Sequence, residues 1–112
     1  MVEVRRERDG ELCGFVTEQS GRWLALTVFG GHLGSFDSRD EAVALVRDTG
    51  LGSMAERWQL RRRGEANAEV VCIQEADPEG VTVALGYYSL PGVPTLRLSR
   101  AELESGAWEL FR

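Results

Sequence analysis

Residues 22–50 read RWLALTVFGGHLGSFDSRDEAVALVRDTG, and this stretch contains both kinds of secondary structure on which the fold is built. Residues 22–29 carry apolar side chains at both odd and even positions, which is typical of a strand covered on both faces. Gly30 and Gly31 can supply the positive φ angles of a tight hairpin into a second strand at residues 32–36. The stretch therefore predicts two antiparallel strands followed directly by a helix.

The start and the end of that helix are both marked in the sequence. Ser38 and Glu41 have the spacing of a capping box, in which each side chain bonds the backbone N–H of the other residue. Apolar residues then recur at helical spacing, and Gly50 is a common C-terminal stop. The spacing predicts a helix over residues 39–49.

Further strands are expected on both sides of this segment. Upstream, the first clear strand covers residues 11–18, after a turn at Asp9-Gly10. A second capping box, formed by Ser99 and Glu102, predicts a short helix over residues 100–105. Alternating apolar residues predict five more strands, at residues 57–63, 69–75, 81–88, 95–98 and 107–111.

These elements indicate an α+β fold in a single domain, residues 1–112. We expect an antiparallel β-meander followed by a helix in residues 1–56 (βββα), packed with a small β-roll or barrel-like half in residues 57–112 that carries the short helix. Halves of this size would each bury too little surface alone, so we expect them to share a core. The residues expected to be largely buried in it are Trp23, Leu45, Trp58, Ile73, Val83, Leu98 and Trp108.

The charges are unevenly distributed along the chain. Residues 1–64 carry ten arginines and ten acidic residues, whereas residues 65–112 carry three arginines and eight acidic residues, which accounts for the net charge of −5. An acidic half is repelled by phosphate, so nucleic-acid binding through it is disfavoured. The sequence shows neither an apolar signal-peptide core nor a membrane-spanning run, which favours a location in a bacterial cytoplasm and no membrane contact.

No motif in the sequence is specific for catalysis, a cofactor or a metal. Cys13 and Cys72 lie far apart in apolar strand patterns, so we expect two reduced, unbridged core residues. His32 is the only histidine, and no nucleophile or orienting carboxylate stands at a suggestive spacing from it. One histidine and two distant cysteines do not form a zinc pattern, and the glycines match no nucleotide-binding motif. We therefore expect a protein that is not an enzyme and has no cofactor.

Two surfaces are candidates for binding. The more distinctive is a pair of tyrosines beside a stiff proline loop, which is typical of recognition surfaces, with Tyr87, Tyr88, Leu90, Pro91 and Pro94 as its candidate residues. The other is the basic run Arg61-Arg62-Arg63, of which Arg61 and Arg63 are expected to point outward. We therefore expect a non-catalytic protein-binding or assembly module. The alternative is an accessory nucleic-acid-associated protein that uses the Arg61–Arg63 face.

A homodimer is also expected from the pattern of apolar strands. Strands that are apolar on both faces leave sheet surface that two short helices cannot cover, and a two-fold dimer is the commonest way to close such a patch. Its rim would pair Arg61 or Arg63 with carboxylates from residues 65–112 of a second copy.

Overall fold

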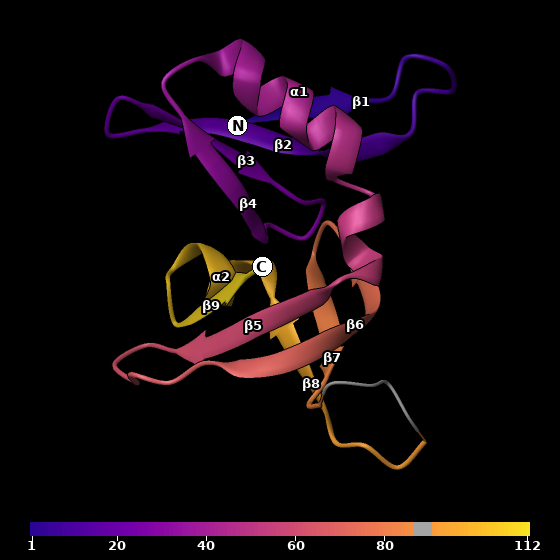
Figure 1. Ribbon diagram of the computed structural model, residues 1–112, viewed down its shortest axis with the longest axis vertical. Helices are drawn as coiled ribbons and strands as arrows, with labels where there is room; N and C mark the ends of the chain where they lie inside the picture. The colour runs from indigo at the N-terminus through magenta and orange to yellow at the C-terminus, as the bar shows by residue number, and fades with distance from the viewer. Residues whose placement is uncertain (87–90) are drawn as a thin grey trace.

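The computed structural model describes residues 1–86 and 91–112 of the chain (Figure 1). The elements in this part of the chain are β1 (Val2–Arg5), β2 (Leu12–Gln19), β3 (Arg22–Leu26), β4 (His32–Phe36), α1 (Arg39–Thr49), the short 3-10 helix η1 (Gly52–Ala55), β5 (Arg57–Arg62), β6 (Glu69–Asp77), β7 (Gly80–Ala84), β8 (Thr95–Ser99), α2 (Arg100–Glu104) and β9 (Trp108–Phe111).

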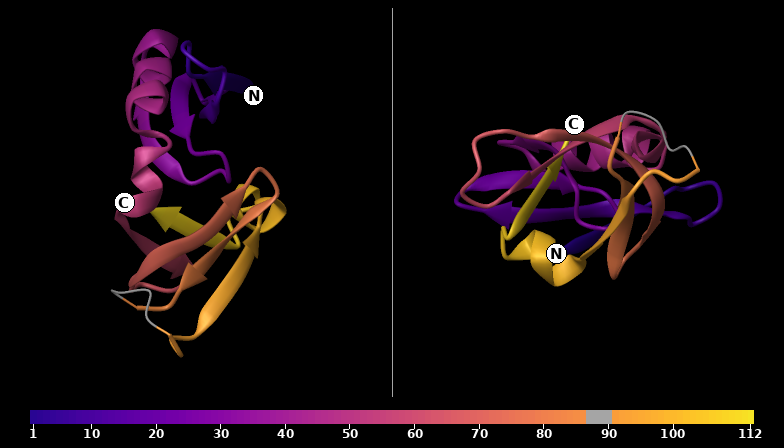
Figure 2. Two further views of the ribbon diagram at one scale, coloured as in Figure 1. Left: turned by 90° about the vertical axis from the view of Figure 1, so that its right-hand side faces the viewer. Right: turned by 90° about the horizontal axis from the view of Figure 1, so that it is seen from below.

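The described strands form one nine-stranded sheet, in the order β1-β2-β3-β4-β9-β5-β6-β7-β8. All neighbours are antiparallel except β4 and β9, which are parallel and joined by a single residue pair, His32 with Phe111. The sheet curls across this narrow seam (Figures 1 and 2). The protein is thus α+β, as expected. Its two halves, however, are joined edge to edge in one mixed sheet, which the sequence did not indicate.

The helix α1 covers the predicted residues, but its predicted capping box does not form. Ser38 has the extended backbone of an N-cap residue, yet its side chain makes no capping hydrogen bond. Packing holds the helix instead, because Ala42 and Val46 are fully buried. Gly50 ends the helix as predicted, but its backbone is right-handed, and a side chain there would collide with the carbonyl of Cys13. Close approach to β2, and not a left-handed turn, therefore requires this glycine.

One apolar cluster runs through both halves of the sheet. Trp58 is fully buried; its ring packs edge-on against Phe29 with centroids 5.7 Å apart, and its indole N–H donates to the Ser53 carbonyl at 2.8 Å. Val83 and Leu98 are fully buried too, as predicted. The remaining four predicted core residues are partly buried and pack against the margin of this cluster: Trp23, Leu45, Ile73 and Trp108. The two short helices leave this margin of the sheet partly open.

The strand β1 was not predicted, because it is short and Val4 is its only buried residue. It is held in a hairpin with β2, in which the Arg6 N–H donates to the Glu11 carbonyl at 2.8 Å. The Arg6 side chain donates to Asp9, whose carboxylate also accepts from the Glu11 N–H. These hydrogen bonds lower the pKa of Asp9 to about 2.

Two predicted strands end earlier than expected. β3 stops at Leu26 instead of residue 29, because the buried Thr27 hydroxyl accepts the Gly31 N–H at 2.8 Å and closes a turn. β7 stops at Ala84, where the Gly86 N–H donates back to the Ala84 carbonyl and bends the chain. The end of the predicted strand at residues 87–88 lies outside the described residues.

Candidate binding groove

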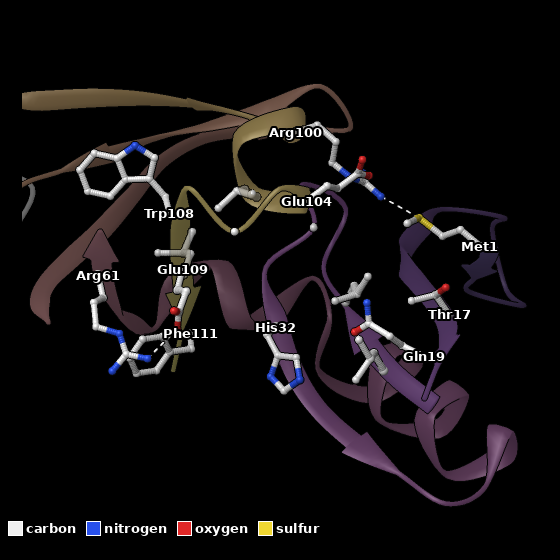
Figure 3. Close-up of a pocket in the computed structure, with 16 residues that line it drawn as sticks. Met1, Thr17, Gln19, His32, Arg61, Arg100, Glu104, Trp108, Glu109 and Phe111 are labelled. Carbon is white, nitrogen blue, oxygen red and sulfur yellow. Dashed lines mark hydrogen bonds and ion pairs between the residues drawn. The ribbon is translucent and has the colours of Figure 1, made fainter. Parts of the chain in front are cut away.

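A groove of about 680 Å³ lies between the N-terminal strands, β9 and α2 (Figure 3). In the close-up, Thr17 and Gln19 lie on one side, Glu109 and Phe111 on the other, and His32 between them. The full lining consists of Met1, Thr17, Gln19, Leu24, Leu26, Gly30, His32, Arg61, Arg100, Leu103, Glu104, Gly106, Trp108, Glu109, Leu110 and Phe111. Segments from both ends of the chain therefore build the site.

The apolar part of the groove comes from the second face of β3. Ala25 is fully buried and pairs with Gly34, which lies against Leu45 of α1. Because side chains alternate along a strand, Leu24 and Leu26 point away from the helix and line the groove. The sequence pattern with apolar residues on both faces is thus explained by a helix on one face and a groove on the other.

The wall formed by β5 and β9 carries a charge that is already paired. Arg61 lies directly opposite Glu109 in the ladder, and Arg61 Nη2 is 2.5 Å from Glu109 Oε2. The Arg61 guanidinium also lies over the Phe111 ring, 5.4 Å from its centroid. On this wall the positive charge of Arg61 is therefore balanced by Glu109, and the Arg61 guanidinium stacks on the Phe111 ring.

Arg100 holds α2 against the N-terminal half. Its Nε is 2.9 Å from the Glu104 carboxylate, and its Nη1 donates to the Val28 carbonyl at 3.1 Å. The guanidinium lies 4.7 Å from the centroid of the Phe15 ring. Only 16% of the Arg100 side chain is exposed, so it acts as a clamp between the halves and not as a free cation for a ligand.

The capping box at the start of α2 forms as predicted and fixes the position of this clamp. The Ser99 hydroxyl accepts the Glu102 N–H at 3.1 Å, and the Glu102 carboxylate accepts the Ser99 N–H at 3.0 Å. Arg100 is the first residue of the helix that this box begins.

His32 projects into the groove from β4 (Figure 3). Partial desolvation of its ring lowers the pKa of His32 below the ordinary value of 6.5, which favours the neutral imidazole at pH 7, although the residue as a whole is exposed. In the part of the chain that the structure describes, no hydrogen bond or ion pair orients the ring. A neutral, unoriented imidazole can contact a ligand, but nothing here pairs it with a nucleophile or a second titrating group.

The predicted basic run is occupied by contacts within the chain. Arg61 is paired with Glu109, as described above, and Arg62 lies over the Trp108 ring, 5.5 Å from its centroid. Arg63 Nε donates to the Gly106 carbonyl at 3.2 Å, and its Nη2 donates to that of Ser105. The three guanidinium groups thus cover β9 and the turn that precedes it.

Of the predicted binding residues that the structure describes, the two prolines lie apart from Arg61. Pro91 and Pro94 are exposed, and the Pro94 carbonyl accepts the Leu85 N–H at 2.8 Å. Their loop joins β7 and β8 at the end of that hairpin opposite α2, whereas Arg61 lines the groove. The other predicted residues of this surface, Tyr87, Tyr88 and Leu90, lie outside the described residues.

The groove residues Leu24, Leu26, Leu103 and Phe111 were not among the predicted site residues. The pattern of β3 indicated an uncovered apolar face, but nothing in the sequence showed which segment would lie beside it. The pairing of His32 with Phe111 brings the last strand there.

The described residues contain neither a candidate metal site nor a disulfide. Residues 1–86 and 91–112 contain no group of three His, Cys, Asp or Glu side chains that could hold a metal ion. Cys13 and Cys72 are free and buried, as predicted.

Within the described ranges, no helix is long and apolar enough to cross a membrane.

Comparison with known proteins adds no assignment: no protein-family model, no curated protein and no solved structure matches this chain.

Proposed function

We propose that the protein is a non-catalytic protein-binding module, and that the groove takes up an apolar segment of a partner protein. The observation that carries this proposal is the partly exposed second face of β3, where Leu24 and Leu26 line a groove of about 680 Å³. A volume of this size is within the range of ligand-binding clefts, which combine apolar walls with a few polar groups.

The charges around the groove support an apolar occupant over an anionic one. Arg61 and Arg100 are each paired with a carboxylate, Glu109 and Glu104. The lowered pKa of His32 favours its neutral form at pH 7, so the side chains of the lining have no net positive charge that would attract phosphate. These pairs also weaken the nucleic-acid alternative, because a phosphate would have to replace contacts that Arg61 and Arg63 already make.

Peptide selection tests this proposal. Peptides selected from a displayed random library against the wild-type protein should be rich in apolar residues. Their binding should be lost in Leu24→Arg, which places a charge in the groove, because burying an unpaired charge is costly. The control is Val70→Arg, since Val70 is 39% exposed on β6 and does not line the groove.

NMR chemical-shift mapping with a selected peptide locates the contact. The amides of β3, His32 and Phe111 should shift. Shifts confined to residues 91–97 would contradict the groove and favour the proline loop. Salt-sensitive retention on DNA that is lost in Arg61→Gln would instead support the nucleic-acid alternative.

A further inference from the structure

The outer edge of β1 is a second surface with a definable partner. β1 is the first strand in the sheet order, so among the described residues one side of its backbone has no neighbouring strand. Met1 and Val2, at its start, are 61% and 38% exposed and are two of the three large apolar side chains exposed in the described part of the chain. Unpaired strand edges of this kind are templates for adding another strand.

Hydrogen bonding shows which backbone groups point outward from this edge. The Arg6 N–H donates into the hairpin, to the Glu11 carbonyl. The Arg5 carbonyl belongs to the same planar trans peptide, so it points the opposite way. It accepts a 3.4 Å hydrogen bond from Arg47 Nε of α1, and a carbonyl oxygen has a second lone pair for another donor. Because the direction alternates along a strand, Glu3 and Arg5 both present their N–H and C=O groups at the edge.

When the β1 strands of two copies lie antiparallel about a two-fold axis, only a few registers bring these backbone groups opposite each other. A register centred on Glu3 places Glu3 opposite Glu3 of the second copy, and one centred on Arg5 places the two arginines opposite each other. A register centred on Val4 places each Glu3 opposite an Arg5. Opposite charges facing each other stabilise a strand pair and like charges destabilise it, so only the register centred on Val4 is complementary.

We propose that the protein forms a two-fold homodimer in which the β1 strands of two copies pair antiparallel around Val4. Each Glu3–Arg5 pair across the interface then exchanges two backbone hydrogen bonds and one ion pair. Glu3 and Arg5 are 54% and 52% exposed. Arg5 Nη1 donates to the Gly10 carbonyl at 2.9 Å, whereas Arg5 Nη2 makes only a loose 3.3 Å contact with Glu3 of its own chain, and this nitrogen can pair with Glu3 of the second copy. This interface differs from the one expected from sequence, in which Arg61 and Arg63, now seen to be engaged within the chain, formed the rim.

Sedimentation equilibrium at low ionic strength tests the dimer. Measurements should extend from about 20 µM to about 1 mM, because an interface of one short strand pair is expected to be weak. The average mass should rise above 12.4 kDa toward twice that value as the concentration increases. Added salt should reduce the association, because the ion pairs are exposed. A mass of 12.4 kDa at every concentration would overturn the proposal.

A charge swap tests the register. Glu3→Arg places two arginines opposite each other at both ends of the interface and should weaken dimerisation by about tenfold. The double variant Glu3→Arg/Arg5→Glu restores complementary pairs and should restore dimerisation. Arg97→Glu, a charge reversal on the opposite edge strand β8, is the matched control and should have no effect.

Either of two results would contradict the proposed register. Dimerisation could be unaffected by Glu3→Arg, or it could stay weak in the double variant. Amide exchange gives an independent readout of the backbone pairing: the N–H groups of Glu3 and Arg5 should exchange more slowly as concentration rises, while that of Val4, which points toward β2, should not change. Equal behaviour of the three amides would also overturn the register.

Discussion

At the scale of single residues, arginine side chains cover aromatic rings at the margin of the core. Each of four arginines lies over one ring, with the guanidinium carbon 4.7 to 5.8 Å from the ring centroid: Arg39 over Trp23, Arg61 over Phe111, Arg62 over Trp108 and Arg100 over Phe15. A planar guanidinium stacks on a ring while its edge keeps its hydrogen bonds. Arginine thus completes the burial that the short helices leave unfinished.

Trp58 is the residue whose loss should cost most stability. It is fully buried, contacts Phe29 from the other half and donates to the Ser53 carbonyl. Trp58→Ala should lower the free energy of unfolding by about 3 to 5 kcal/mol, measured by urea denaturation. Trp108→Ala is the matched control and should cost clearly less, because Trp108 is only partly buried. Equal losses of unfolding free energy in the two variants would show that Trp58 contributes no more to the core than Trp108 does.

At the scale of elements, the two predicted capping boxes behave differently, although they share the sequence Ser-Arg-x-Glu. At α2 both hydrogen bonds of the box form, and the helix has no buried residue to hold it. At α1 the Ser38 side chain makes no cap bond, and buried side chains anchor the helix. The motif therefore predicts where each helix begins, while tertiary packing decides whether the box is used.

Alanine substitution at the two serines tests this difference. Ser99→Ala removes a hydrogen bond that is present and should lower the free energy of unfolding by about 1 kcal/mol. Ser38→Ala removes none and should have a much smaller effect. Chemical denaturation of both variants measures the contrast. A larger loss from Ser38→Ala would show that its capping box forms in solution.

The elements predicted well are those whose signals are local. α1 has the predicted bounds because its helical spacing and its ends lie within one short stretch. β1 was missed because its apolar alternation, Val2 and Val4, spans only four residues, too few to mark a strand without knowledge of its neighbour in the sheet. The groove was only half predictable for the same reason. The two-sided pattern of β3 is local, but its opposite wall depends on residues near the other end of the chain.

At the scale of the whole molecule, two kinds of contact join the halves. The strand seam is minimal, a single pair between His32 and Phe111. The core is broader, because Phe29 packs on Trp58, and Arg100 adds a hydrogen bond to the Val28 carbonyl. Side-chain packing, and not the backbone ladder, therefore supplies most of the contact between residues 1–56 and 57–112.

This arrangement predicts that the protein unfolds as one cooperative unit. Each half alone would bury too little surface to be stable, and the shared apolar cluster couples them. Urea unfolding followed by far-UV circular dichroism and by tryptophan fluorescence should therefore give coincident transitions. Phe29→Ala, in the N-terminal half, should shift both transitions equally, because it removes the partner of Trp58 from the cluster. Separate transitions would show that the single strand pair at the seam leaves two independent folding units. A shift of only one probe in Phe29→Ala would show the same.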